Sequence, residues 1–258
     1  MLWHVDNTTL WILGSVHASD RPLLISGQTT QALDSADVLA FESNFDVVPN
    51  LAPARYESGT TLSMNIHDLL FADTQRLWRE FFLNEEELEG FRPWWVAFRL
   101  MNAAMSKRGF VREQGIDQRV LNFGKKNNKA LFFLEPIDAG LAAFANAPLQ
   151  EQEVFLSRAA LHTEEGLQEV AFLVAAWESG NPENLTPVVE RALRLMPVAY
   201  AAALAGRNRA WLRHLLRLIR SRKVVVVVVG MLHMVGPDNI PSVLAAAGFK
   251  CSLDKEKP

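Results

Sequence analysis

Two near-identical motifs at opposite ends of the chain constrain its fold most. Near the amino terminus the apolar stretch Leu10–Leu13 leads into Gly14-Ser15-Val16-His17. Near the carboxyl terminus six valines, Val224–Val229, lead into Gly230-Met231-Leu232-His233. An uninterrupted aliphatic run is typical of a strand buried on both faces, and glycine lets the backbone turn or approach a ligand. Each histidine is therefore expected just beyond the carboxyl end of a buried strand, the edge where open α/β sheets bind ligands.

A βαβ unit is predicted after the first motif. A helix beginning at Ser19 or Asp20 and ending near Asp37 is expected to lead into the buried strand Val38–Phe41, which Glu42 follows. Because crossovers between parallel strands are right-handed, both carboxyl ends lie at the same edge of the sheet. His17 and Glu42 are therefore expected to be neighbours.

The rest of the chain adds further strands and long helical stretches. Leu2–Val5 and Thr8–Leu13 are expected to form a hairpin, Ala130–Leu134 to form a third buried strand that ends in Glu135, and the last residues to close the sheet. Helical insertions are expected at about 50–112 and 146–197, and the aromatic residues of the first insertion are interpreted as core. The predicted fold is a three-layer α/β domain over residues 1–258, with a mostly parallel sheet, an N-terminal hairpin and large helical insertions.

Composition excludes several kinds of partner. A formal net charge of −3 gives no electrostatic basis for binding nucleic acid. The longest aliphatic run, six valines, is far shorter than the roughly 20 apolar residues of a membrane span. The chain has a single cysteine and no signal-peptide pattern, so a cytoplasmic location is expected, with a removed leader and a periplasmic or secreted location as the alternative.

Four strand ends then suggest a site. They place His17, Glu42, Glu135 and His233 on one edge of the sheet. Two imidazoles and two carboxylates suit a divalent ion such as zinc, manganese, cobalt or iron, and a carboxylate that is not on the metal could act as general base. No compact HExxH-type pattern supports this interpretation.

Each of these residues also has a structural interpretation. A histidine at a strand end is more often hydrogen-bonded than a ligand, although the matched settings of His17 and His233 favour the functional interpretation. Glu135 could cap the next helix or pair with an arginine such as Arg207. Ser15 is interpreted as a residue that satisfies the backbone, since no Gly-x-Ser-x-Gly elbow surrounds it.

Taken together, the motifs resemble a known family. The two Gly-x-x-His motifs, Glu42, Pro93-Trp94, Gly115-Ile116-Asp117, Leu134-Glu135 and Arg207-Asn208 occur in the order typical of the TraB/PrgY/GumN family, closest to its GumN branch. The resemblance runs from about Leu2 to Ser252. That family is related to the TIKI metalloproteases and, more distantly, to the erythromycin esterase and ChaN-like proteins.

The resemblance implies a TIKI/erythromycin esterase/ChaN-like fold with both motifs in one site. It implies that His17, Glu42 and His233 hold a divalent metal, and that these residues, Glu135 and Arg207 are catalytic. It places Asp117, Asn208 and Ser15 around them as substrate-binding or supporting residues. Arg207 could hold a substrate carboxylate or an oxyanion. Pro136 and Gly140 replace the usual threonine and glutamine, and Met231-Leu232 are bulkier than usual.

Three functions follow as hypotheses. The first is a divalent-metal-dependent hydrolase of peptide or amide bonds, in which metal-activated water is the nucleophile. The second is a non-catalytic protein that sequesters a peptide signal or carries haem or iron. The third is a metal-free esterase in which His17 and Glu42 act as a general-base pair.

Overall fold

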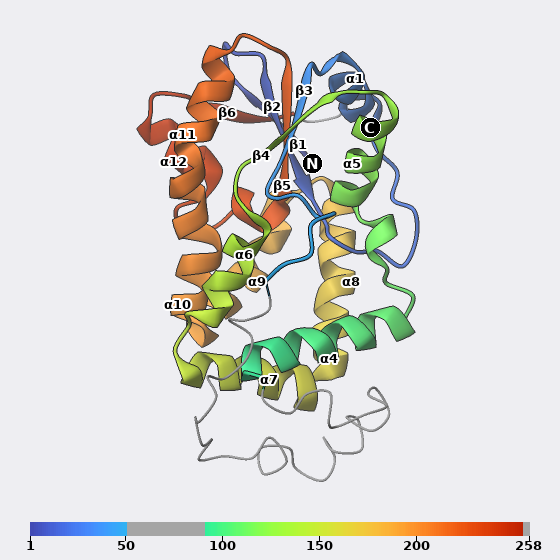
Figure 1. Cartoon of the computed structure of the whole chain (residues 1–258), viewed down its shortest axis with the longest axis vertical. Coiled ribbons are helices and arrows are strands. Elements are labelled where there is room, and N and C mark those ends of the chain that lie inside the picture. Colours follow the sequence, from blue (N-terminus) through green and yellow to red (C-terminus); the bar gives the residue numbers. More distant parts are fainter. Residues whose placement is uncertain (51–90, 255–258) are drawn as a thin grey trace.

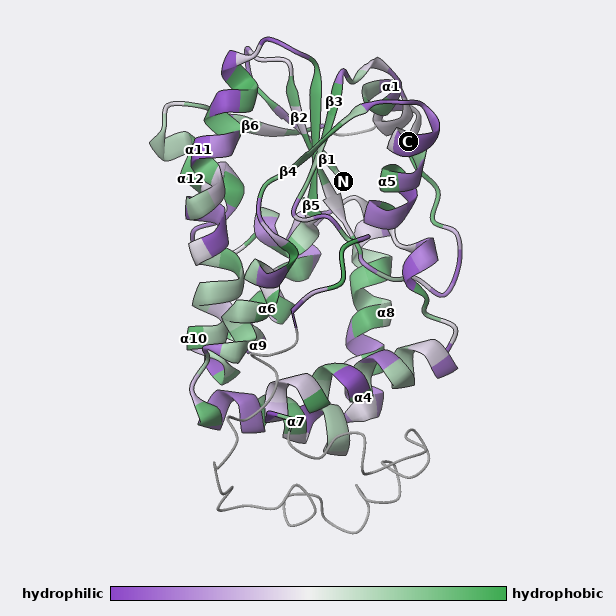
Figure 2. Ribbon diagram, in the orientation of Figure 1, coloured by the Kyte–Doolittle hydropathy of each residue, from purple (hydrophilic) through white to green (hydrophobic). Residues whose placement is uncertain are grey.

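A six-stranded mixed sheet forms the centre of the molecule. The computed structural model describes residues 1–50 and 91–254. The strands are β1 (Leu2–Val5), β2 (Leu10–Ser15), β3 (Val38–Phe41), β4 (Ala130–Phe133), β5 (Val225–Gly230) and β6 (Cys251–Asp254). Their order is β4-β3-β5-β2-β1-β6, and the first four strands in that order are parallel. The predicted α/β class is therefore confirmed (Figure 1), and Figure 2 shows apolar strands at the centre of the sheet.

The predicted hairpin opens the chain. β1 pairs with β2 antiparallel, and Asn7 takes a positive φ of 59° in the turn between them. Asparagine tolerates this left-handed conformation better than most residues. β1 also pairs with β6, so the last strand closes the sheet beside the first, as expected.

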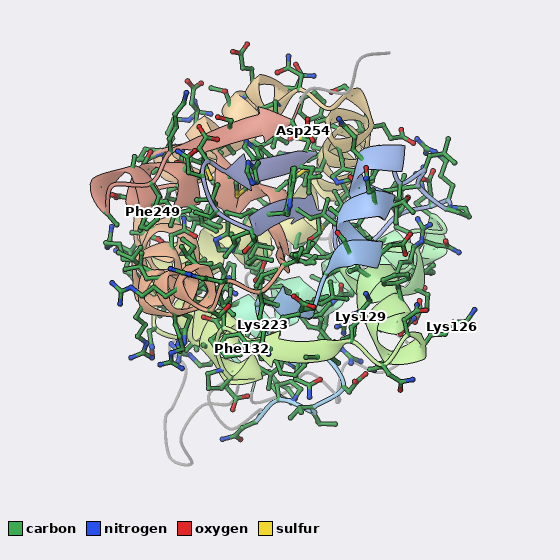
Figure 3. The ribbon with its side chains drawn as sticks, turned by 90° about the horizontal axis from the view of Figure 1, so that it is seen from above. Lys126, Lys129, Phe132, Lys223, Phe249 and Asp254 are labelled. Carbon is green, nitrogen blue, oxygen red and sulfur yellow. The ribbon has the colours of Figure 1, made fainter. Side chains whose placement is uncertain are left out.

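Helices cover both faces of the sheet. One face packs against α1 (Gly27–Ser35), α5 (Ile116–Lys126) and α8 (Thr163–Ser179), and the other against α11 (Arg207–Arg220) and α12 (Ile240–Ala246). Figure 3 looks onto the end where the parallel strands begin, with Lys129 and Lys223, which precede β4 and β5, labelled. The expected three layers are present.

The remaining helices lie beyond the opposite end of the strands (Figure 1). They are α4 (Pro93–Lys107), α6 (Ile137–Ala145), α7 (Leu149–Leu161), α9 (Thr186–Leu195) and α10 (Pro197–Tyr200), with short 3₁₀ turns η3 (Arg112–Gln114) and η4 (Pro182–Leu185). A π-helical segment, η5 (Ala201–Gly206), joins α10 to α11. Residues 51–90 of the first predicted insertion lie outside the described residues.

The core interpretation of the aromatic residues holds where the structure describes them. Phe91 and Trp94 are buried in a cluster made by α4, α6 and α7, with Trp95 and Phe98 packed against it. Phe98 contacts the rings of Phe144 and Phe155 edge to face. This cluster is a third core, separate from those on the two faces of the sheet.

Two predictions of local structure are wrong. The helix after His17 begins at Gly27, because the side chain of Ser26 accepts the N–H of Thr29, whereas Ser19 forms an isolated bridge with Val111. β4 is an edge strand that is only partly buried, since it pairs with β3 alone. A hydrophobic run predicts a strand, but it does not predict whether that strand lies in the centre or at the edge of the sheet.

Candidate functional site

The first Gly-x-x-His motif is attached to the start of α5. The N–H of Ile116 donates to the carbonyl of Val16 at 2.9 Å, and His17 Nδ1 donates to Asp117 Oδ2 at 2.6 Å. A Cβ on Gly115 would lie 2.4 Å from the carbonyl oxygen of His17, so only glycine permits this approach. The His17 side chain is 61% exposed, which leaves its Nε2 accessible.

The second motif is held from α11. After β5 the chain makes a 3₁₀ turn, η6 (Met231–Met234), that buries His233. His233 Nδ1 donates to Asn208 Oδ1 at 2.6 Å, and Asn208 Nδ2 donates to the carbonyl of Asp238 at 2.8 Å. His233 Nε2 lies 3.6 Å from Glu42 Oε1. Both histidines thus use Nδ1 for a fixed hydrogen bond and keep Nε2 for the site.

Glu42 lies between the two motifs. Its carboxylate is buried, with Oε1 accepting the N–H of Gly230 at 2.6 Å and Oε2 accepting Arg207 Nη2 at 2.5 Å. A Cβ on Gly230 would lie 3.2 Å from His17 Nε2 and 3.3 Å from Glu42 Oε1. The absent side chain of Gly230 therefore marks the point where the first motif, the second motif and Glu42 meet.

Arg207 is fully engaged within the protein. Its Nε donates to Glu135 Oε1 at 2.8 Å, and its Nη2 contacts both Glu135 Oε1 and Glu42 Oε2. Nη1 donates to the carbonyl of Ala203 at 3.1 Å and lies 3.4 Å from His233 Nε2. Each of the three guanidinium nitrogens therefore donates at least one hydrogen bond within the protein. Glu135 thus forms the ion pair with Arg207 that its structural interpretation predicted.

Trp211 also belongs to the site. Its Nε1 donates to Glu135 Oε2 at 2.8 Å, its ring lies 4.7 Å below the Arg207 guanidinium, and it packs 4.6 Å from the His233 ring. The spacing of four residues from Arg207 puts both on one side of α11. This spacing is the feature of the sequence that could have predicted that Trp211 lies near Arg207.

Ser15 departs from its predicted role. The residue is 2% exposed, and its Oγ has no hydrogen-bond partner among the described residues. The interpretation as a residue that satisfies the backbone is therefore wrong. Asp117 and Asn208, in contrast, each orient one histidine, as expected of supporting residues.

The charges differ strongly between the members of the site. Burial raises the pKa of Glu42, but His233, Arg207 and His17 outweigh it and lower the pKa to about 2. Burial, assisted by Arg207 and His17, lowers the pKa of His233 to about 3 against the attraction of Glu42. Burial lowers the pKa of His17, but the attraction of Asp117 outweighs this effect and raises the pKa to about 9. Water weakens that attraction, because the His17 side chain is largely exposed. At neutral pH the site holds an ionised Glu42 and a neutral His233.

Imidazole nitrogens and carboxylate oxygens are suitable ligands for a divalent ion, but in this structure they do not lie close enough together to form a complete metal site. Across residues 1–50 and 91–254, no group of three or more His, Cys, Asp or Glu side chains could hold a metal ion as placed. The pair Glu42 Oε1 and His233 Nε2, 3.6 Å apart, has a separation that two ligands with bonds of ~2.1 Å can adopt. His17 Nε2 would have to approach them to complete three ligands.

Comparison with known proteins covers almost the whole chain. The model of the TraB/PrgY/gumN family matches residues 1–253. Uncharacterized protein YbaP of Escherichia coli strain K12 is 23% identical over 240 residues, or 92% of this chain and 88% of that protein. The Shigella flexneri protein of the same name is 23% identical over 235 residues, or 90% and 86%. No solved structure matches significantly, and within the described part of the chain no helix has the length and apolarity to cross a membrane.

Proposed function

Because the chain belongs to the TraB/PrgY/gumN family, we propose that it is a divalent-metal-dependent hydrolase of peptide or amide bonds, with the fold arrangement of the TIKI, erythromycin esterase and ChaN-like proteins. One observation carries the proposal. Two histidines from opposite ends of the chain each fix Nδ1 in a hydrogen bond and direct Nε2 to the surroundings of the same carboxylate oxygen, Glu42 Oε1.

This arrangement is the one that metal-binding histidines use. Such histidines donate the second ring N–H to a carboxylate or carbonyl, which selects the tautomer and orients the ring. Asp117 does this for His17 and Asn208 for His233. His17, Glu42 and His233 would hold the ion, which when bound would polarise a carbonyl and supply an activated water at neutral pH.

The protonation states of the two histidines set the pH range. The lowered pKa of His233 keeps its Nε2 unprotonated at neutral pH. His17 carries a proton until the pH approaches about 9, so a cation must displace that proton to use its Nε2. Metal affinity is therefore expected to rise between pH 6 and 9.

Arg207 neutralises negative charge in the site. It separates the negative charges of Glu42 and Glu135, and its remaining N–H groups point to Ala203 and His233. Both oxygens of Glu135 are occupied by Arg207 and Trp211. Glu135 therefore positions Arg207 and Trp211 and is not assigned a proton transfer in the reaction.

Metal analysis joined to a peptidase assay tests the proposal. Protein purified without added metal is measured for bound metal and for cleavage of a peptide mixture, with chelator and then with manganese, cobalt or zinc restored. His17→Ala and His233→Ala should each lose metal binding and turnover. His4→Ala is the matched control, because His4 bonds only to the carbonyl of Thr8 on the hairpin. A protein that holds no metal and gains no activity from any of the three ions would refute the proposal.

The metal-free esterase remains the second candidate. It is favoured by the short bond between Asp117 and the exposed His17, the geometry of a carboxylate that orients a general base. In that case ester turnover would survive chelator, whereas Glu42→Gln would abolish it. Visible absorbance on purification, or saturable peptide binding without turnover, would instead identify a carrier or sequestering protein.

A further inference from the structure

An unpaired hydroxyl lies beside the candidate site. Ser15 ends β2, the residue is 2% exposed, and no described residue accepts from or donates to its Oγ. Buried polar groups are nearly always paired, because the hydrogen bonds that they lose with water are otherwise not replaced. An unpaired hydroxyl at this place calls for a partner beyond the described residues.

The sheet register places this hydroxyl next to the centre of the site. Ser15 is paired with Gly230 across the parallel strands β2 and β5. Paired residues direct their side chains to the same face of the sheet, about 4.8 Å apart. On that face, the position of a Gly230 Cβ is within 3.3 Å of both His17 Nε2 and Glu42 Oε1. The Ser15 side chain is therefore one strand away from the point where the two motifs meet.

The other side-chain donors in the network are already engaged. Each of the three nitrogens of Arg207 donates within the protein. Asn208 Nδ2 donates to the carbonyl of Asp238, and Trp211 Nε1 donates to Glu135. Among the described side chains of this network, Ser15 thus offers a neutral hydrogen-bond donor that no protein atom uses.

We propose that Ser15 is a catalytic residue whose hydroxyl donates a hydrogen bond to the carbonyl oxygen of the scissile amide. This inference rests on the proposed hydrolase function. When water oxygen bonds to the carbonyl carbon, the C=O π pair moves to oxygen, and the Ser15 O–H stabilises that charge. The C–N bond then breaks, the amine leaves with a proton that the attacking water gives up, and Ser15 keeps its own proton throughout. The role of holding the oxyanion, predicted for Arg207, passes to Ser15.

The variant Ser15→Ala tests this role with two independent readouts. Removing an unpaired buried hydroxyl should leave the midpoint of thermal unfolding unchanged or slightly higher. Loss of one oxyanion donor should lower kcat about 100-fold or more while KM changes little. Binding of a peptide phosphonate, whose tetrahedral oxygens mimic the oxyanion, should weaken by a similar factor in calorimetry.

Ser26→Ala is the matched control. Ser26 Oγ caps α1 by accepting the N–H of Thr29 at 3.2 Å, so this variant loses a hydroxyl that the fold uses. It should lower the unfolding midpoint by about 2–4 °C and leave kcat and phosphonate binding unchanged. The two variants are thus expected to have opposite effects on stability and activity.

Distinct results overturn the inference and the proposed function. A parent protein that cleaves peptides, with a Ser15→Ala variant of equal kcat and equal phosphonate affinity, overturns the role of Ser15 alone. A Ser15→Ala variant whose unfolding midpoint drops as far as that of Ser26→Ala shows a hydroxyl paired within the free protein, and also overturns it. A parent protein that neither turns over peptides nor binds the phosphonate overturns the hydrolase function, and this inference with it.

Discussion

Acid should destabilise this protein through one buried histidine. His233 is 3% exposed, and its Nε2 lies 3.4 Å from Nη1 of Arg207, so a proton on Nε2 would meet the guanidinium at short range. Burial first, and then Arg207 and His17, lower its pKa to about 3, against the opposing attraction of Glu42. The folded protein therefore keeps His233 neutral under conditions in which the unfolded chain protonates it.

The sign and size of the effect follow from linkage. A histidine in an unfolded chain has a pKa of about 6.5, so between pH 6.5 and 3 the unfolded state binds the additional proton and stability falls as the pH falls. Each pH unit well inside this interval removes about 1.4 kcal/mol. From pH 6.5 to 4.5 the loss from His233 should be about 2 kcal/mol. Glu42, with a folded pKa of about 2, contributes stability that is retained above pH 4.5.

Urea unfolding in the presence of chelator, at pH 6.5, 5.5 and 4.5, measures this loss. The comparison is with His233→Asn, whose amide can still donate to Asn208 but does not titrate. The variant should be less stable at pH 6.5, and its free energy of unfolding should fall by about 2 kcal/mol less than that of the parent by pH 4.5. His214, whose pKa is also lowered by burial and by Arg213, is present in both proteins and cancels. Parallel profiles within about 0.5 kcal/mol would show that the native state already carries the proton, and would refute the reasoning.

Two further predictions concern positions that support the site. Gly115→Ala should lower the free energy of unfolding by about 1–3 kcal/mol, because its Cβ would lie 2.4 Å from the carbonyl oxygen of His17. Gly27→Ala, with no atom within 4 Å of its Cβ, is the control and should be neutral or stabilising in the same chemical denaturation; equal losses in the two variants would contradict the steric argument. Trp211→Phe should cost about 1–3 kcal/mol by removing the N–H that Glu135 Oε2 accepts. A double-mutant cycle with Glu135→Gln checks this, and strictly additive losses would show that the hydrogen bond contributes nothing.

The sequence predicted which residues reach the site better than it predicted their roles. His17, Glu42 and His233 were placed together because buried strands are readable as apolar runs and parallel strands end at the same edge. The same logic failed for the helix after His17, since Ser26 rather than Ser19 supplies the cap. Several residues in that stretch can cap a helix, and long-range pairing decided between them.

Local patterns therefore determined the sheet, its hairpin and the edge where the two motifs meet. Only the tertiary structure decided which side chains form hydrogen bonds with one another at that edge. Arg207 and Glu42 are separated by 165 positions in the chain, and no local pattern could show that they bond to one another. The unpaired hydroxyl of Ser15 is equally invisible in sequence, because a hydrogen bond needs a donor and an acceptor about 3 Å apart, and only the packed fold brings such atoms together.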